Sequence, residues 1–373
     1  MSPDHCDVLI VGGGPAGSSC AWALRQAGLD VLVLDKSGFP RNKVCAGWIT
    51  PPVLDALHID HADYARDRVL QPITGFGVGR IGDMPLETDY SHVVSYGIRR
   101  CEFDHYLLQR TGARLRLDEP LRSIERQDGG WLINQHIEAP LLIGAGGHFC
   151  PVARHLGADV GSGELAVTAR EIEFPMSPTQ QQGCRVAPER PELYFCADLK
   201  GYGWVFRKGD YLNVGLGRED PHRLAEHNAA FLTWLKTTGR IPADVPEAFK
   251  GHAYLLYSHG TRKLLDDGVL LIGDAAGLAY PQSGEGIRPA IESGLMAAAT
   301  VIAANGHYGT DQLEPYRRRL LSRFGATENI SLIPDTVRQF IGERLLSSRW
   351  LTRHVLLNHW FLHSHQPALK MAS

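Results

Sequence analysis

A glycine-rich turn near the N-terminus restricts the fold of this chain more than any other part of its sequence. Residues 7–11 read DVLIV, an apolar run typical of a buried strand, and a G-x-G-x-x-G pattern follows at once. A helical segment then extends to Gly28, and a second apolar run at residues 31–34 ends at Asp35. Strand, glycine turn, helix, strand and acid within about 30 residues predict a Rossmann-type unit that binds a dinucleotide.

Each position of this unit has a physical task. We expect Gly12 to form the tight turn, Gly14 to let the backbone approach a pyrophosphate, and Gly17 to permit close packing of helix on strand. The free N–H groups at the helix start favour phosphate charge, and the Asp35 carboxylate can accept hydrogen bonds from a ribose. The alternative is a purely structural glycine turn. The predicted cofactor contacts here are Gly12, Gly14, Pro15, Ala16, Gly17, Asp35 and Lys36.

A second informative segment lies near the other end of the chain. Residues 269–272 form an apolar run, Gly273 and Asp274 follow, and a loop rich in proline and glycine leads to a helix from about Gly286. Here the chain resembles the flavoprotein family of para-hydroxybenzoate hydroxylase-type monooxygenases, flavin-dependent halogenases and geranylgeranyl reductases. The resemblance implies FAD as the cofactor, with Asp274 on its ribityl–phosphate part and the helix start near the flavin pyrimidine, where helix N–H groups would stabilise negative charge. The residues implied at this end are Asp274, Pro281, Gly284, Gly286 and Ile287.

Two shorter segments resemble the same family. Residues 100–104, RCEFD, match an R-x-x-F-D segment whose Arg contacts the cofactor in relatives, which implies that role for Arg100. Residues 141–154 are similar to a monooxygenase segment that reads A-D-G-x-x-S-x-x-R, but Gly146 replaces its Asp and Cys150 its Ser. Gly146 is still expected beside the cofactor. Because relatives use that Asp with NAD(P)H, the electron donor stays open among NAD(P)H, a separate reductase and a ferredoxin-type protein.

A narrower resemblance points to the geranylgeranyl reductases. Residues 39–47, FPRNKVCAG, look like their P-R-x-K-x-C-x-G segment, and residues 202–217 resemble their Y-x-W-x-F-P…G-x-G substrate-pocket signature, with Arg207 in place of the Pro. That cation could meet an anionic group of the substrate or be solvated at the surface. The residues implied beside the flavin are Arg41, Cys45, Ala46 and Gly47, and those implied in the substrate pocket are Tyr202, Trp204, Phe206 and Arg207.

Cys45 is the candidate catalytic residue. In the reductases that the chain resembles, the equivalent Cys lies close to the flavin ring, where a thiol could donate a proton to a substrate carbon. The alternative is a small side chain that only packs beside the cofactor, because free Cys is often a core residue.

The middle of the chain alternates in the manner of strands, with turn residues between the runs. We therefore expect an α/β protein with a Rossmann-type FAD-binding domain of the para-hydroxybenzoate hydroxylase fold, an antiparallel β-sheet substrate domain and a helical C-terminal region. The expected FAD-binding domain comprises residues 1–70, 97–160 and 262–305, the substrate domain 71–96 and 161–261, and the C-terminal region 306–373.

These features predict an FAD-dependent oxidoreductase that transfers hydride to a C=C bond of an apolar, isoprenoid-like or natural-product substrate. The alternatives are a monooxygenase that uses O2 with electrons from a separate donor, a non-redox cyclase or isomerase, and a non-catalytic FAD-binding partner protein. The formal net charge of -3 argues against nucleic-acid binding, and seven scattered cysteines indicate neither a disulfide framework nor a metal site.

The ends of the chain bear on its location. The N-terminus lacks the basic segment of a signal peptide, so a cytoplasmic enzyme is expected. Residues 315–365 hold eight Arg against three acids, together with Trp350 and Trp360. A basic helix with Trp could contact a membrane surface peripherally, or it could pack over the protein's own core.

Overall fold

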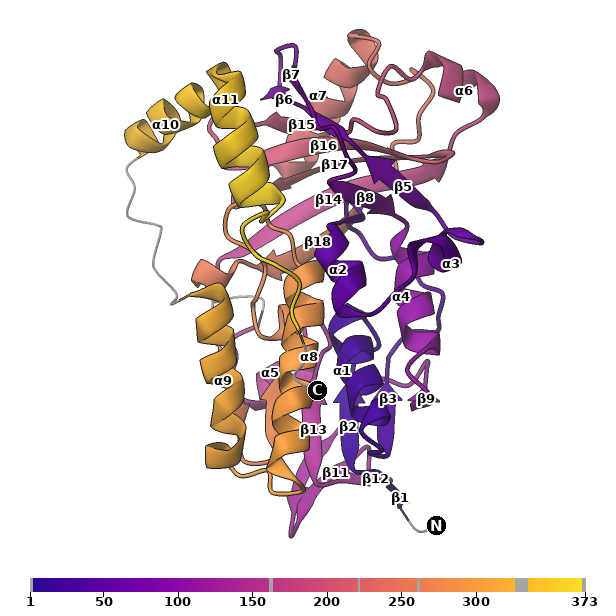
Figure 1. Ribbon diagram of the computed structural model, residues 1–373, viewed down its shortest axis with the longest axis vertical. Helices are drawn as coiled ribbons and strands as arrows, with labels where there is room; N and C mark the ends of the chain where they lie inside the picture. Colours follow the sequence, from indigo (N-terminus) through magenta and orange to yellow (C-terminus); the bar gives the residue numbers. More distant parts are fainter. Residues whose placement is uncertain (1–2, 161–163, 221, 260–261, 326–334, 371–373) are drawn as a thin grey trace.

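The computed structural model describes residues 3–160, 164–220, 222–259, 262–325 and 335–370. Its lower half is built on a six-stranded sheet of order β19-β20-β13-β2-β3-β9, parallel except for the β19–β20 pair (Figure 1). The strands of this sheet are β2 (Val8–Val11), β3 (Val31–Leu34), β9 (Arg114–Arg116), β13 (Leu141–Gly144), β19 (Leu265–Asp266) and β20 (Val269–Leu271). Four of them are buried along their whole length, as expected for a parallel sheet covered on both faces.

Two helices pack closely against one another beside this sheet. Helix α1 (Pro15–Gln26) begins directly after the glycine turn, with Pro15 at its first position. Helix α8 (Ile287–Ala304) approaches α1 so closely that a Cβ at Gly294 would collide with the carbonyl oxygen of Ala16. By length and composition α8 could cross a membrane, but 83% of it is buried inside the molecule, as in the core helix of a soluble protein.

A seven-stranded sheet forms the upper half and is called the roof below (Figure 1). Its order is β18-β14-β17-β16-β15-β6-β7. The strands are β6 (Gly75–Arg80), β7 (Leu86–Asp89), β14 (Ala166–Pro175), β15 (Glu192–Phe195), β16 (Gly201–Lys208), β17 (Tyr211–Arg218) and β18 (Lys250–Leu255). The roof is antiparallel as expected, except that β6 and β15 run parallel, because a long crossover separates them in the chain.

Two smaller sheets and six further helices complete this part of the described structure. One sheet has the order β4-β8-β5 and joins the two halves, and the other has the order β1-β12-β11-β10. Their strands are β1 (Asp4–His5), β4 (Trp48–Ile49), β5 (Leu70–Ile73), β8 (Ser95–Ile98), β10 (Ile124–Gln127), β11 (Gly130–Ile133) and β12 (Ile137–Ala139). The helices are α2 (Pro51–Ala56), α3 (His61–Ala65), α4 (Arg100–Gln109), α5 (Pro151–His155), α6 (Pro178–Gly183) and α7 (Leu224–Thr237), with single turns at η1 (Tyr257–His259) and η2 (Gly273–Ala275).

The C-terminal region is helical, as expected, and its last residues return to the lower half. It comprises α9 (Thr310–Phe324), α10 (Asp335–Ser347), α11 (Arg349–Leu351) and the π-helical η4 (Thr352–Phe361). From η4 the chain runs back beside α8, where the Arg288 guanidinium donates to the carbonyl oxygens of Gln366 and Pro367 (Figure 1). Glu328, one of the acids in the predicted basic segment, lies outside the described residues.

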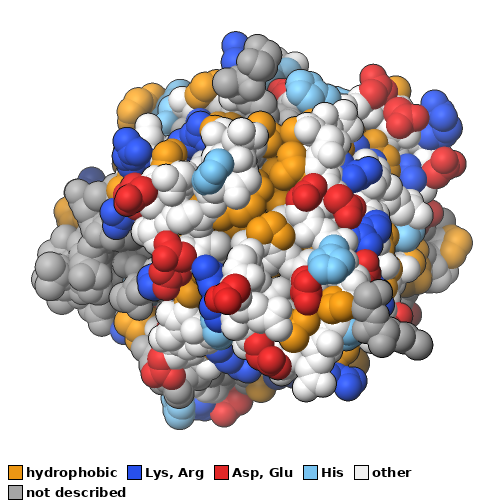
Figure 2. All heavy atoms as spheres, turned by 90° about the horizontal axis from the view of Figure 1, so that it is seen from below, with side chains coloured by type: hydrophobic (Ala, Val, Ile, Leu, Met, Phe, Trp, Pro, Cys, Tyr) orange, Lys and Arg blue, Asp and Glu red, His pale blue; other side chains and the backbone are white. Residues whose placement is uncertain are grey.

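The surface is of mixed charge, in agreement with the small net charge. Figure 2 shows acidic and basic side chains intermingled on the lower face, around a group of apolar side chains. The predicted α/β class, with a Rossmann-type unit, a second sheet and a helical C-terminal region, is confirmed. The exact domain boundaries stay a prediction.

Candidate functional site

The glycine turn after β2 has the geometry that its sequence requires. Gly12 has a φ of 116°, and a Cβ there would collide with the carbonyl oxygen of Ala145. A Cβ at Gly17 would collide with the carbonyl oxygen of Gly12, so Gly17 lets α1 lie against the turn. Gly14 differs, because a Cβ there would meet only the Arg41 guanidinium, at 3.4 Å. The protein therefore needs glycine at the first and third positions for its own packing, while the second faces open space.

That open space is a cleft of about 550 Å³ between the two halves of the molecule. It begins at Asp35, passes the start of α1 and reaches the start of α8 and the underside of the roof. Asp35 accepts hydrogen bonds from the backbone N–H groups of Gly13 (2.7 Å) and Ser37 (2.9 Å), which fixes its carboxylate at the end of β3. A carboxylate has further lone pairs, so Asp35 can still accept from a ligand hydroxyl.

Most of the predicted site residues line this one cleft, although they come from distant parts of the chain. From the cofactor set these are Gly12, Gly14, Pro15, Ala16, Asp35, Lys36, Arg41, Cys45, Ala46, Arg100, Gly146, Asp274, Gly284, Gly286 and Ile287, and from the substrate set Tyr202 and Trp204. Their individual roles stay predictions. Gly17, as shown above, acts within the turn.

The other four predicted residues lie off the cleft. Phe206 is only 1% exposed and packs against Trp48, so its side chain belongs to the aromatic core beneath the roof. Arg207 is on the opposite face of β16 from Phe206, where it approaches the backbone of α6, so the structure does not support either residue as a pocket wall. Pro281 lines a smaller hollow of about 80 Å³ that adjoins the cleft at Tyr202.

Gly47 has a packing role that the sequence did not indicate. Its φ is 64°, and a Cβ there would collide with the carbonyl oxygen of Ile98 and crowd the Lys208 ammonium. Glycine is therefore required for the segment after Cys45 to lie against the roof and the β8 strand.

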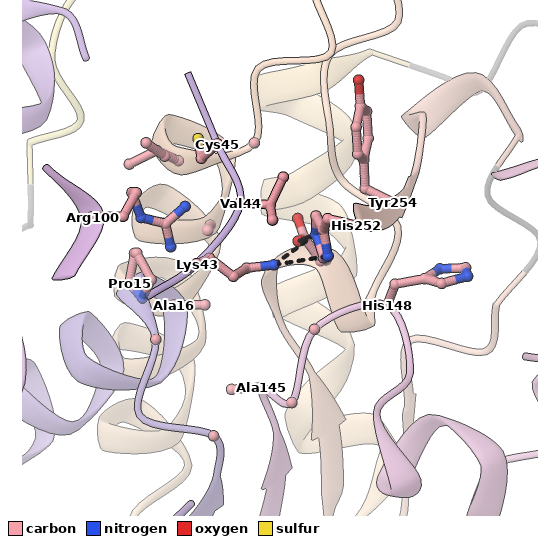
Figure 3. Close-up of a pocket in the computed structure, with 18 of the residues that line it drawn as sticks. Pro15, Ala16, Lys43, Val44, Cys45, Arg100, Ala145, His148, His252 and Tyr254 are labelled. Carbon is pink, nitrogen blue, oxygen red and sulfur yellow. Dashed lines mark hydrogen bonds and ion pairs between the residues drawn. The ribbon is translucent and has the colours of Figure 1, made fainter. Parts of the chain in front are cut away.

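Lys43, His252 and Asp274 form a partly buried cluster in the cleft, and Figure 3 shows the Lys43 ammonium directed at the His252 ring. The Lys43 ammonium lies 2.6 Å from Nε2 of His252, and that nitrogen lies 3.7 Å from the Asp274 carboxylate. Burial and the Lys43 charge lower the pKa of His252 to about 4, so its ring is neutral at neutral pH and can accept from the ammonium. Burial also lowers the pKa of Lys43 to about 8. Burial alone would raise the pKa of Asp274, but His252 and Lys43 lower it to about 2 and keep it ionised.

Arg100 and Cys45 lie side by side at the opposite wall of the cleft (Figure 3). Arg100 holds the Asp104 carboxylate with two hydrogen bonds, of 2.8 and 2.9 Å, and its guanidinium also interacts with the Cys45 side chain. Burial would lower the pKa of Arg100, but the Asp104 charge and Cys45 raise it well above its ordinary value. Arg100 is thus a permanent cation at this wall, and Cys45 is partly exposed beside it.

Glu285 is a cleft residue that the sequence reasoning did not single out. One of its carboxylate oxygens accepts from the backbone N–H of Arg288 at the start of α8 (2.8 Å), and within the described chain the other is buried without a hydrogen-bond partner. Burial raises the pKa of Glu285 to about 7. His252 was also outside the predicted set, whereas Lys43 lies in the P-R-x-K-x-C-x-G segment and was a candidate to hold phosphate or flavin. For His252, which lies in the strand sequence KGHAYL, no local motif marks it as a site residue.

The cleft suits the cofactor that the sequence implied. The open side of Gly14 leaves room for a pyrophosphate against the α1 start, and Arg41 supplies a cation at that position. Asp35 lies at one end of the same cleft, and Gly286 with Ile287 starts a helix at the other. A dinucleotide with a flavin ring needs an acid, a phosphate cradle and a helix start in this order.

Comparisons with known proteins agree with this geometry. Residues 7–80 match the family model for FAD dependent oxidoreductases. The geranylgeranyl diphosphate reductase of Rhodobacter capsulatus is 29% identical over 314 residues, which cover 80% of this chain and 75% of the relative.

Two solved structures share the fold. A geranylgeranyl bacteriochlorophyll reductase-like protein from Thermoplasma acidophilum superposes with a TM-score of 0.76 at 20% identity, over 97% of this chain and 98% of the other. A probable FAD-dependent monooxygenase from Pseudomonas aeruginosa superposes with a TM-score of 0.67 at 20% identity, over 95% of this chain and all of the other.

Proposed function

We propose that this FAD-dependent oxidoreductase, which is geranylgeranyl reductase-like, reduces a carbon–carbon double bond in an apolar, isoprenoid-like substrate. FAD, when bound, supplies the hydride chemistry of such a reaction. The residues that would hold it are the Gly12–Gly14 turn with the α1 start, Asp35, Arg41, Asp274 and the α8 start.

The observation that carries this proposal is the continuity of the cleft from the glycine turn to an aromatic wall. Tyr202 and Trp204 of the roof line the same space as Cys45, Arg100 and the α8 start. Aromatic side chains provide a large apolar contact surface, and a roof over the cleft excludes water from the reacting atoms. An apolar substrate that lies under Tyr202 and Trp204 would therefore meet the flavin end of the site.

The protein must also supply a proton. Hydride adds to one carbon of the double bond, and the other carbon then has to be protonated. We assign this to the Cys45 thiol, which lines the cleft beside the Arg100 guanidinium. A nearby cation stabilises the thiolate that remains after proton transfer. Direct contact between Cys45 and the substrate carbon is part of the proposal.

The proposal is tested by reducing the FAD-saturated protein without oxygen and then mixing it with geranylgeranyl diphosphate. We expect the flavin absorbance to return while the product gains two hydrogen atoms for each flavin reoxidised. Reoxidation that requires O2, with oxygen incorporated into the product, would instead establish a monooxygenase supplied by a separate electron donor. Turnover with no net electron consumption would establish a cyclase or isomerase.

We further propose a cytoplasmic protein that contacts membranes peripherally through α10 to η4. Phe340 and Trp350 are exposed there, and Arg344 and Arg349 are close to them in sequence. Such a surface would suit an apolar substrate that partitions into lipid. Sedimentation with vesicles that contain anionic lipid, compared with vesicles of neutral lipid alone, tests it, and Trp350→Ala should reduce binding to the anionic vesicles. If the wild-type protein and Trp350→Ala stay in the supernatant to the same extent with anionic vesicles, the membrane contact is refuted.

A further inference from the structure

The backbone of Cys45 and Ala46, called the Cys45 segment below, forms hydrogen bonds with a buried polar network of the roof. At its centre is Asn213 of β17, which is fully buried. The Asn213 side-chain N–H groups face the carbonyl oxygen of Cys45 (3.2 Å) and the carboxylates of Glu171 (3.1 Å) and Glu173 (3.2 Å). Its side-chain oxygen accepts from the Trp204 indole N–H at 2.7 Å.

The orientation of the Asn213 amide is fixed by these partners. An indole N–H can only donate, so the Asn213 oxygen must face Trp204 and the NH2 group must face the Cys45 carbonyl. One side chain therefore ties together two residues that line the cleft from different halves of the molecule, Trp204 from the roof and Cys45 from the segment after β3.

Glu171 of β14 holds the other backbone group of the same residue. Its carboxylate accepts a hydrogen bond from the backbone of Cys45 as well as from Asn213. Its side chain is buried, and burial raises its pKa to about 7. Next along the segment, the carbonyl oxygen of Ala46 accepts from the fully buried Lys208 ammonium (2.8 Å), which is ion-paired with Glu173. The Cys45–Ala46 backbone is thus bonded to the roof at consecutive positions.

We propose that Asn213 and Glu171 are positioning residues that fix the Cys45 thiol and the Trp204 indole relative to one another across the cleft. They act through the Cys45 backbone and the Trp204 indole, because neither residue lines the cleft. The consequence for turnover rests on the proposed function, whereas the positioning itself can be measured on a protein that is not turning over.

The experiment measures the rate at which iodoacetamide alkylates Cys45 in the FAD-saturated protein, by peptide mass spectrometry. Cys101, which is also partly exposed, gives an internal reference in the same sample. Asn213→Leu keeps the number and branching of the side-chain heavy atoms and removes the donor and the acceptor of the amide, so the Cys45 segment should open more often. We expect the ratio of Cys45 to Cys101 alkylation to rise about tenfold.

Glu171 supplies a second pair of variants in case Asn213→Leu does not fold. Glu171→Gln keeps an oxygen that can accept from the Cys45 backbone, so its ratio should stay within about twofold of the wild type. Glu171→Leu removes that acceptor and should behave like Asn213→Leu. Trp204→Phe removes the indole donor together with part of the ring and should also raise the ratio, because the Asn213 amide is then free to turn.

Tyr194→Phe is the matched control. It removes a buried hydrogen bond of 2.7 Å to Glu192 in the same sheet and leaves the Cys45 segment untouched. If the two leucine variants lose stability as Tyr194→Phe does, yet all keep the wild-type alkylation ratio, the network only stabilises the roof and the proposal is refuted. This result would leave the proposed reaction untouched, because no substrate is involved.

Discussion

The two walls of the cleft are built by different means. The lower wall is built around the backbone: the glycine turn, the start of α1 and the start of α8 present N–H groups and open space, and charged side chains such as Asp35, Arg41 and Asp274 stand beside them. The roof relies on side chains, namely Tyr202, Trp204 and the buried network around Asn213. A surface formed by backbone requires particular residue types at fixed spacing in the sequence. A surface formed by side chains can be built from residues on separate strands.

The largest expected effect is on the lower wall, from Gly17→Val. Its Cβ would collide with the Gly12 carbonyl, which is backbone and cannot move aside as a flexible side chain could. We expect a loss of more than about 4 kcal/mol of folding free energy, seen as absent soluble protein. Gly183→Ala is the control, since no atom lies within 4 Å of the Cβ position there. A soluble Gly17→Val protein with an ordinary unfolding temperature would show that α1 does not lie against the turn.

Gly14→Val should separate cofactor binding from folding. A side chain at Gly14 meets only the flexible Arg41 guanidinium within the protein, but it fills the space expected for the pyrophosphate. We expect soluble protein whose FAD affinity is at least about a hundredfold lower, or roughly 3 kcal/mol. Flavin absorbance after gel filtration and the unfolding temperature of the FAD-free form measure the two effects. Full FAD content in Gly14→Val would contradict the placement of the cofactor.

The contrast between the walls also explains what the sequence revealed. The expected strand at residues 7–11 and the expected helix start near Gly286 agree with β2 and α8 to within one residue. Steric limits at Gly12 and Gly17 leave a pattern that survives in a single sequence, and this pattern predicted a turn that binds a dinucleotide. The prediction of FAD came instead from the family resemblance of the segment around Asp274.

The roof was less predictable because its function is decided by which face of a strand each residue occupies. Tyr202, Trp204 and Phe206 occupy every second position of β16 and so share one face of the strand. The cleft reaches only Tyr202 and Trp204, whereas Phe206 is buried in the core. His252 and Asn213 take part through partners that are distant in sequence, Lys43 and Cys45. No local spacing encodes such contacts, so only the three-dimensional structure brings them together.

The pH dependence of stability tests the roof network through Glu171→Gln. The pKa of Glu171 is raised to about 7 by burial, from 4.5 in the unfolded chain. Between these values the unfolded chain has lost the proton that the folded protein keeps, so wild-type stability falls as the pH rises from 4.5 to about 7. Gln does not titrate. The stability of Glu171→Gln relative to wild type should therefore increase by up to about 3 kcal/mol over this range.

Urea unfolding of both proteins at about pH 5 and about pH 8 measures this difference. Wild type and Glu171→Gln share every other titrating group, and the contributions of distant groups cancel in the comparison, so the difference reports on Glu171 together with its charged neighbours Lys208 and Glu173. Parallel stability curves for the two proteins would mean that the Glu171 carboxyl is solvated in the folded state and does not form the buried contact with Asn213.

The smallest expected effect concerns the junction of the two walls. The Tyr202 hydroxyl donates to the carbonyl oxygen of Ser283, which lies in the loop that leads to α8. Burial keeps the pKa of Tyr202 well above its ordinary value, so the hydroxyl stays protonated and remains a donor. Tyr202→Phe should lower stability by about 1 kcal/mol, as should Tyr194→Phe within the roof. Tyr202→Phe alone should also speed the release of FAD, measured by flavin fluorescence, because it frees the loop that precedes the α8 start. Equal FAD release from both variants would show that roof and lower wall hold the cofactor independently.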